Sequence, residues 1–317
     1  RTYGVALLLF LATLGACKNN PLDITPDGKI SLEEVFNDRV RTEAYLNTVY
    51  GFIPEYYARY YERAFLAGVT DEAQDAETGN YTTMAGNWIN GGLSPSNDPI
   101  AHTGHDPNAN TYVSCWSGIR HANIFLDRLE GVTFLTPEIK SRYRSEATLL
   151  RAFYYWELIR KFGAMPVFDK PLPNDFDYLS LKRPDFQTTV DFIVESCDRV
   201  IADPNIPLRI TSDVEATRFT KAVAYAVKSQ ALLFNASPLW NPQNDAAKWQ
   251  AAADAGREAL TALTAGGQFA LVSDYESYFQ STTDFSPAPR DRETIYERRS
   301  YFGWDIWSIP SRGGNWK

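Results

Sequence analysis

The sequence predicts an all-α protein built from paired helices, with long irregular loop insertions and very little sheet. Two regions, 111–162 and 218–263, repeat apolar residues at the spacing of an amphipathic helix. Only three short runs suggest strands, at 165–168, 269–272 and 294–297. Since these runs are few and short, we expect helices rather than a central sheet to form the core.

The start of the chain predicts a signal peptide and a lipid anchor. An apolar run over 5–12 leads to Leu14-Gly15-Ala16-Cys17. About eight apolar residues are too few to cross a bilayer, but they suit the core of a signal peptide. The Leu-Gly-Ala-Cys ending resembles the bacterial lipobox, in which a peptidase cuts before the cysteine and the thiol carries lipid. We expect a signal over 1–16 and an anchor on Cys17; an ordinary signal peptide and a buried N-terminal helix are the alternatives.

A polar tether and a helical domain are predicted to follow the signal. Residues 17–30 contain Pro and Gly and read as a flexible tether, with the helical domain over 31–317. Ser31 and Glu34 have the spacing of a capping box, and helical spacing continues to about residue 65 with a break near Pro54. Gly, Asn, Pro, Ser and Asp dominate from 68 to 110, which predicts a long irregular insertion.

Periodicity predicts five further helices, over 111–129, 137–162, 188–202, 218–236 and 245–263. The segment 137–162 is apolar over so much of its circumference that we expect burial on more than one side. Gly163 and Pro166 predict its end. Four tryptophans fall within or at the ends of these helices and are predicted to pack in the core: Trp116, Trp156, Trp240 and Trp249.

The last two predicted helices resemble one tetratricopeptide unit. Small residues would let the two helices approach closely, at Ala226, Ala231, Ala252, Ala255 and Ala259. Ala147, Ala152 and Tyr155 match positions 226, 231 and 234 at a constant offset of 79, which predicts a second unit with 163–185 inserted between its helices. Such arrays bury a shared core by stacking and serve mainly as scaffolds for binding. A generic helical bundle is the alternative.

Charge and cysteine content exclude some classes of protein. The formal net charge is −8, which argues against a nucleic-acid partner because phosphate binding needs clustered Lys and Arg. Three cysteines do not make a disulfide framework. Cys115 and Cys197 fall in predicted helices and are interpreted as buried thiols, with a bridge between them as the alternative.

The sequence offers no catalytic centre, so we predict no catalytic residue, metal or cofactor. Asp71 and Glu72 are neighbours and point in different directions, whereas the two acids of a glycosidase must face one another across the sugar. His102, His105 and Asp106 could ligate a metal, but a loop HxxHD without a partner motif is a weak signal. His121 falls within a helix and is interpreted as a packing residue.

Four stretches, in this order, carry a resemblance to a known family. They are FLAGVTDE over 65–72, WSGIRHANIFL over 116–126, SEATLLRAFYYWELIRKFGAMP over 145–166, and the run over 219–241 that ends in ASPLWN. With the lipobox, they resemble the SusD/RagB family of Bacteroidetes outer-membrane lipoproteins. Thr148-Leu149 departs from the usual Arg-Phe pair. Family members continue further, and 313–317 looks like mid-protein sequence, so we expect 31–317 to be the N-terminal part of a longer SusD-like domain.

The resemblance implies a binding function at the cell surface. It implies non-catalytic capture of a nutrient at the outer membrane, an oligosaccharide or, as in the RagB branch, a peptide. It also implies a partner, a SusC-like TonB-dependent transporter. A tetratricopeptide scaffold that binds only protein and a lipid-anchored glycoside hydrolase are the alternatives.

Aromatic residues in the predicted loops are the candidate ligand-binding residues. An indole face stacks on the C–H face of a sugar, while amide side chains bond its hydroxyls. SusD-like proteins bind glycans through loop aromatics, which favours Trp88 and Trp304; ordinary burial under loops is the alternative. The whole candidate set is Asn87, Trp88, Asn90, Tyr301, Trp304 and Trp307.

Overall fold

The computed structural model describes residues 30–54, 71, 111–276 and 292–297. In this part of the chain the secondary structure is helical, without a strand, which confirms the predicted all-α class. The helices are α2 (Leu32–Phe36), α3 (Arg39–Gly51), α5 (Thr111–Leu129), α6 (Pro137–Phe162), α7 (Phe186–Ala202), α8 (Lys221–Ala236) and α9 (Ala246–Thr264), with short 3-10 turns at Tyr178–Ser180, Asp213–Glu215 and Ala265–Gly267.

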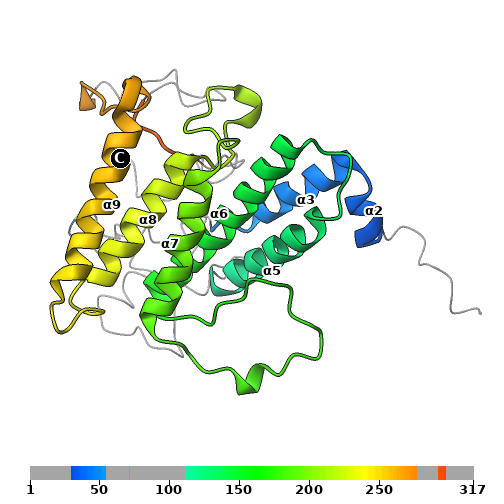
Figure 1. Cartoon of the computed structure of the whole chain (residues 1–317), viewed down its shortest axis with the longest axis horizontal. Coiled ribbons are helices and arrows are strands. Elements are labelled where there is room, and N and C mark those ends of the chain that lie inside the picture. Colours follow the sequence, from blue (N-terminus) through cyan, green and yellow to red (C-terminus); the bar gives the residue numbers. More distant parts are fainter. Residues whose placement is uncertain (1–29, 55–70, 72–110, 277–291, 298–317) are drawn as a thin grey trace, which may run out of the picture.

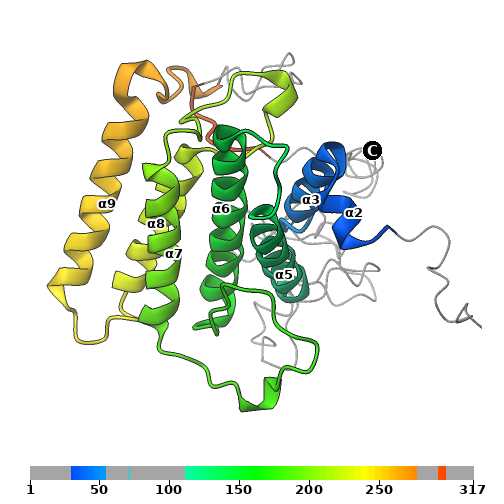
Figure 2. The same ribbon diagram turned by 45° about the vertical axis from the view of Figure 1, so that its right-hand side comes forward.

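The helices stack in the order of the sequence. Each of α5 to α9 packs against the next, α3 lies against α5 and α6, and α2 packs on α3 (Figure 1). Turning the molecule shows α6, α7, α8 and α9 side by side and alternating in direction (Figure 2). The pairs α6–α7 and α8–α9 are those expected of a tetratricopeptide-like array, and the predicted insertion at 163–185 forms the long loop between α6 and α7.

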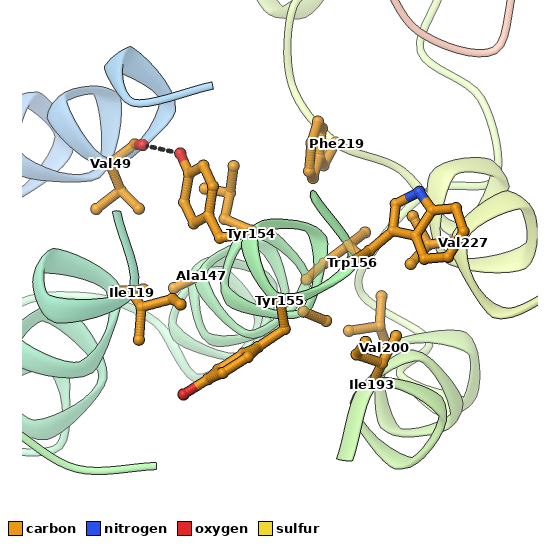
Figure 3. Close-up of a cluster of buried hydrophobic side chains, with 14 of the residues drawn as sticks. Val49, Ile119, Ala147, Tyr154, Tyr155, Trp156, Ile193, Val200, Phe219 and Val227 are labelled. Atoms are coloured by element: carbon orange, nitrogen blue, oxygen red, sulfur yellow. Dashed lines mark hydrogen bonds between the residues drawn. The ribbon is translucent and has the colours of Figure 1, made fainter. Parts of the chain in front are cut away.

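Helix α6 is the centre of the core. Fifteen of its 26 residues are buried, so the helix is covered on more than one side, as predicted. Figure 3 shows side chains from its neighbours converging on it, including Ile119 of α5, Ile193 of α7 and Val227 of α8. Its Tyr154 hydroxyl donates to the backbone carbonyl of Val49 on α3, which ties the first helices to the array.

The N-terminal helical region is divided differently from the prediction. Ser31 and Glu34 form the expected capping box on α2. The chain then breaks at Asn37 and restarts at α3, because the Asp38 carboxylate caps the new helix by accepting from the Arg41 amide at 2.8 Å. A single helical run up to the break near Pro54 was therefore the wrong prediction.

The other predicted helix boundaries are close to those in the structure. The bounds of α5 and α6 match the prediction, and Gly163 ends α6 with φ of 78°. Helix α7 begins two residues earlier than predicted because Asp185 caps it, accepting from the Thr188 amide at 2.7 Å. Helix α8 begins three residues later than predicted, because its N-cap Thr220 has extended backbone angles (φ −129°, ψ 173°) and Phe219 before it donates its amide to the Tyr50 hydroxyl of α3 at 2.8 Å.

The strand-like runs form no strand among the described residues, and bends fall at 269 and 295. Segments 269–272 and 292–297 lie side by side through one backbone hydrogen bond, from the Ala270 amide to the Arg292 carbonyl at 3.0 Å. The next donor, the Val272 amide, bonds the Glu293 side chain instead, so no ladder develops.

The tryptophan prediction is wrong at one position of four. Trp156 is buried, and Trp116 and Trp240 pack partly buried against the core. Trp249 is 39% exposed and donates to the Asn244 side chain at 2.9 Å. The reason is that the buried positions of α9 are alanines, Ala252, Ala255 and Ala259, so the larger side chain at 249 lies outside that seam.

Both cysteines within the described helices are buried free thiols. Cys115 lies in α5 and Cys197 in α7, which confirms the interpretation as packing residues. Burial raises the pKa of the Cys197 thiol, so it stays protonated at neutral pH. None of the described helices is both long and apolar enough to span a membrane.

Candidate functional site

A cleft of about 470 Å³ opens between α5 and the 163–185 loop. Its helical wall presents one face of α5, since positions 112, 116, 120 and 123 recur at helical spacing. Its other wall comes from the extended start and the middle of the loop. The residues that matter for its chemistry are Tyr112, Trp116, Ser117, Arg120 and Asn123 on α5, and Phe168, Leu172, Tyr178 and Leu181 on the loop.

Side chains of the helices hold the extended wall by its backbone. The Tyr155 hydroxyl accepts from the Phe168 amide at 2.8 Å and donates to the Pro166 carbonyl at 3.3 Å. Thr189 bonds both the amide and the carbonyl of Met165, at 3.1 and 2.9 Å. These contacts replace the ladder that a neighbouring strand would supply. Helix side chains, and not a neighbouring strand, therefore bond the backbone of the run at 165–168.

Asn123 and Arg151 form a polar pair that also bonds the backbone of the loop. Asn123 donates to the carbonyls of Phe168 and Lys170 at 3.0 and 3.2 Å. Its own oxygen accepts from Arg151 at 2.7 Å, and Arg151 also donates to the Asp169 carbonyl at 3.0 Å. Burial lowers the pKa of Arg151 to about 10, so the guanidinium still carries its charge at neutral pH. The wall is thus fixed before any ligand arrives.

Aromatic rings run through the cleft from α5 to the rim. The Trp116 ring lies 6.1 Å from that of Tyr112 and 5.8 Å from that of Phe168. Phe168 in turn contacts Phe176, whose ring lies 5.1 Å from Tyr178. Tyr178 is 57% exposed and marks the rim. The Trp116 indole nitrogen is buried, and no described residue accepts a hydrogen bond from it.

This arrangement can bind a small ligand. Ligand pockets of about 300–1,000 Å³ are typically lined by apolar and aromatic side chains with a few polar groups, as here. Groups of His, Cys, Asp and Glu able to hold a metal do not occur among the described residues. The cleft lining holds no carboxylate in the part of the chain that the structure describes, so it offers no acid for glycoside hydrolysis.

The buried carboxylates among the described residues, Glu146 and Glu157, are engaged in ion pairs. Glu146 accepts from Arg218 at 2.8 Å, from Arg142 at 3.1 Å and from the Tyr50 hydroxyl at 2.9 Å. Glu157 pairs with Arg160 and, at 3.0 Å, with Lys161. Both acids therefore pair with basic residues rather than facing one another.

His121 is a packing residue, in agreement with the sequence interpretation. Its Nδ1 lies 3.0 Å from the Tyr45 hydroxyl, and its ring stacks on Phe52 with centroids 4.9 Å apart. Burial, followed by the nearby charge of Arg120, lowers the pKa of His121 below its usual value.

Stability is expected to fall as the pH drops below about 6.5 because of His121. The unfolded chain protonates this residue near its usual pKa, whereas the folded protein keeps it neutral to lower pH. The unfolded state therefore binds more protons between the two pKa values, and the free energy of unfolding rises with pH in that window. Urea denaturation of wild type and His121→Gln across this range should show their difference shrinking as pH falls. A constant difference would contradict the assignment.

The candidate residues predicted from the sequence lie outside the described residues. This holds for Cys17 and for all six loop residues: Asn87, Trp88, Asn90, Tyr301, Trp304 and Trp307. It also holds for Glu72, His102, His105 and Asp106, while Asp71 is described and exposed. Sequence reasoning missed the cleft. The one signal in the sequence was the group of aromatic residues in the insertion, Phe168, Phe176 and Tyr178. The spacing of these residues does not show that the insertion packs against α5.

Comparison with known proteins gives one family. A sequence model of the SusD-like family, described as starch-binding and associating with the outer membrane, matches residues 22–233. A curated relative, the SusD-like protein P38 of Formosa agariphila, is 23% identical over 279 residues, which cover 86% of this chain and 47% of that protein.

Solved structures show the same fold. A SusD-like protein of Bacteroides fragilis superposes with a TM-score of 0.64 at 20% identity, covering 85% of this chain and 46% of its own. A laminarin-binding SusD-like protein gives a TM-score of 0.60 at 20% identity, over 78% of this chain and 50% of its own. The chain thus spans about half the length of these relatives. The family match covers well over half of the present sequence, and the chain belongs to the SusD-like family.

Proposed function

We propose that this protein binds a nutrient glycan at the surface of the outer membrane without chemically altering it. The observation that carries the proposal is the match of residues 22–233 to a family described as starch-binding and associating with the outer membrane. The ion-paired state of both buried carboxylates, Glu146 and Glu157, supports binding rather than hydrolysis by the described part. An oligosaccharide is the proposed ligand, and a peptide is the competing one.

Delivery to a transporter is the second part of the proposal. A SusC-like TonB-dependent transporter would receive the captured nutrient. Lipid on Cys17 would hold the protein on the membrane without a spanning helix, since each buried acyl methylene contributes about 0.8 kcal/mol.

Cys17→Ala is expected to abolish the lipid anchor. The variant should incorporate no acyl label and should leave the outer-membrane fraction, while the wild type is labelled and stays there. The measurement is metabolic acyl labelling followed by membrane fractionation. A wild type without label that still fractionates with the outer membrane would contradict lipidation at Cys17.

Trp88→Ala and Trp304→Ala are each expected to weaken glycan affinity about five- to thirtyfold, because each removes a stacking contact of about 1–2 kcal/mol. Titration calorimetry against a panel of oligosaccharides and peptides measures this. The melting temperature should stay nearly unchanged, whereas truncating a core tryptophan costs about 3–5 kcal/mol of stability.

Trp249→Ala is the matched control for these two variants. Trp249 is exposed on α9 and belongs to neither loop segment, so its loss should leave glycan affinity unchanged. If Trp88→Ala and Trp304→Ala leave the affinity unaltered but lower the melting temperature strongly, both residues pack in the core and do not bind the ligand. Binding of no glycan by the wild type would refute the proposed function itself.

A further inference from the structure

We propose that the cleft between α5 and the 163–185 loop is a second carbohydrate subsite, and that it favours a sugar ring carrying a negative charge. The proposal rests on the glycan-binding function proposed above. It concerns residues different from the loop aromatics at 87–90 and 301–307, and it names both a ligand class and the groups that would recognise it.

The shape and rigidity of the cleft fit a sugar ring. Its volume of about 470 Å³ is that of a small-ligand site and far below what a folded partner needs. The extended wall is anchored through Tyr155 and Asn123, so binding does not have to order it. A preformed wall improves affinity because less conformational entropy is lost when the ligand binds.

The aromatic rim supplies stacking surface. Tyr112 is 41% exposed and Tyr178 is 57% exposed, one on each wall. A pyranose has an apolar C–H face that packs on such rings, while its hydroxyls need polar partners nearby. The Ser117 hydroxyl lines the same space. A purely apolar ligand would make no use of this hydroxyl or of the Arg120 guanidinium.

The positive charge of Arg120 would favour sugars that carry a negative charge. Arg120 lies on the exposed side of α5, and among the described residues that line the cleft it alone carries a charge. No carboxylate in the described part of the chain forms an ion pair with it, although the chain as a whole is acidic. A guanidinium pairs with a carboxylate or sulfate through two parallel hydrogen bonds, which neutral hydroxyls cannot match. The occupant that satisfies both the rings and Arg120 is an acidic sugar.

The test compares two oligosaccharides that differ only in whether one ring carries a carboxylate, titrated into the full chain by calorimetry. We expect the wild type to bind the acidic member more tightly. Arg120→Gln should lower affinity for the acidic member about tenfold and leave the neutral member unchanged, because a charge-assisted bond is lost. Tyr178→Ala should weaken both members about two- to tenfold, because both stack on the ring.

Arg128→Gln is the control for Arg120→Gln, since Arg128 is an exposed arginine on the same helix that does not line the cleft. It should change neither affinity. Both Arg120 and Tyr178 are exposed, so the variants should melt with the wild type, which a thermal scan verifies.

Several outcomes overturn the subsite. If the wild type binds glycan and only Trp88→Ala and Trp304→Ala weaken it, the subsite is wrong while the proposed function stands. Equal losses for Arg120→Gln and Arg128→Gln, or equal losses for both oligosaccharides, would overturn the selectivity for charge. A detergent monomer can be titrated in the same way. If Tyr178→Ala abolishes binding of the detergent and leaves binding of both oligosaccharides unchanged, the cleft binds apolar ligands and is not a sugar subsite. If the wild type binds no glycan at all, the proposed function fails together with the subsite.

Discussion

Glu146→Leu is expected to lower the free energy of unfolding by about 3–5 kcal/mol, the cost of breaking a buried ion pair by removing one partner. The Glu146 side chain is fully buried and neutralises Arg218, whose side chain is only 16% exposed. Its loss leaves that guanidinium without a carboxylate and the Tyr50 hydroxyl without its acceptor. Chemical denaturation followed by circular dichroism measures the change.

The matched experiment removes both charges of this pair. Glu146→Leu combined with Arg218→Met should recover most of the lost stability, because two apolar side chains of similar size replace a buried pair at little cost. Glu130→Gln is the control: Glu130 pairs with Arg144 at 2.7 Å on the surface, and exposed pairs contribute less than about 1 kcal/mol. Equal losses for Glu146→Leu and Glu130→Gln would contradict the role given to Glu146.

Gly118→Ala is expected to destabilise the protein by about 1–3 kcal/mol through overpacking between α5 and α6. A Cβ atom at this position would lie 2.4 Å from the Tyr154 ring, closer than carbon atoms approach. The ring cannot move aside easily, because it is fully buried and its hydroxyl is bonded to the Val49 carbonyl. Thermal and chemical denaturation of the variant give the value.

Gly256→Ala is the control for the glycine argument, since it lies inside α9 with open space where a Cβ would stand. There the substitution should stabilise by about 0.5–1 kcal/mol, because alanine is the better helix former and no contact opposes it. Gly118→Ala combined with Tyr154→Leu tests the contact itself. If the two changes add without coupling, the clash with Tyr154 is not the cause.

Local patterns were enough to predict the helices but not all their divisions. The bounds of α5 and α6 follow from periodicity and from the stop at Gly163. The division between α2 and α3 was missed because apolar spacing continues across it, while α2 ends at its C-cap Asn37 and Asp38 caps the next helix. An aspartate within a periodic run is ambiguous until its carboxylate is seen to bond a backbone amide.

The cleft could not have been predicted, because it depends on contacts between distant parts of the chain. Asn123 meets the carbonyls of Phe168 and Lys170 across more than forty residues of sequence. The strand-like composition of 165–168 marked a segment outside the helices, yet it carries no information on which groups bond that backbone. Here Tyr155 and Thr189 do so, and both look like ordinary helix residues in the sequence.

The anchoring of the extended segment at 165–170 has a consequence for the order of assembly. Its backbone partners are side chains from three helices: Asn123 on α5, Arg151 and Tyr155 on α6, and Thr189 on α7. The segment cannot form these hydrogen bonds by itself, because each of them needs a side chain from one of the three helices. Opening of these few contacts alone would release the segment while the helices stay folded, which hydrogen exchange of the Phe168 amide would detect. We therefore expect the wall of the cleft to be completed only after α5, α6 and α7 have docked.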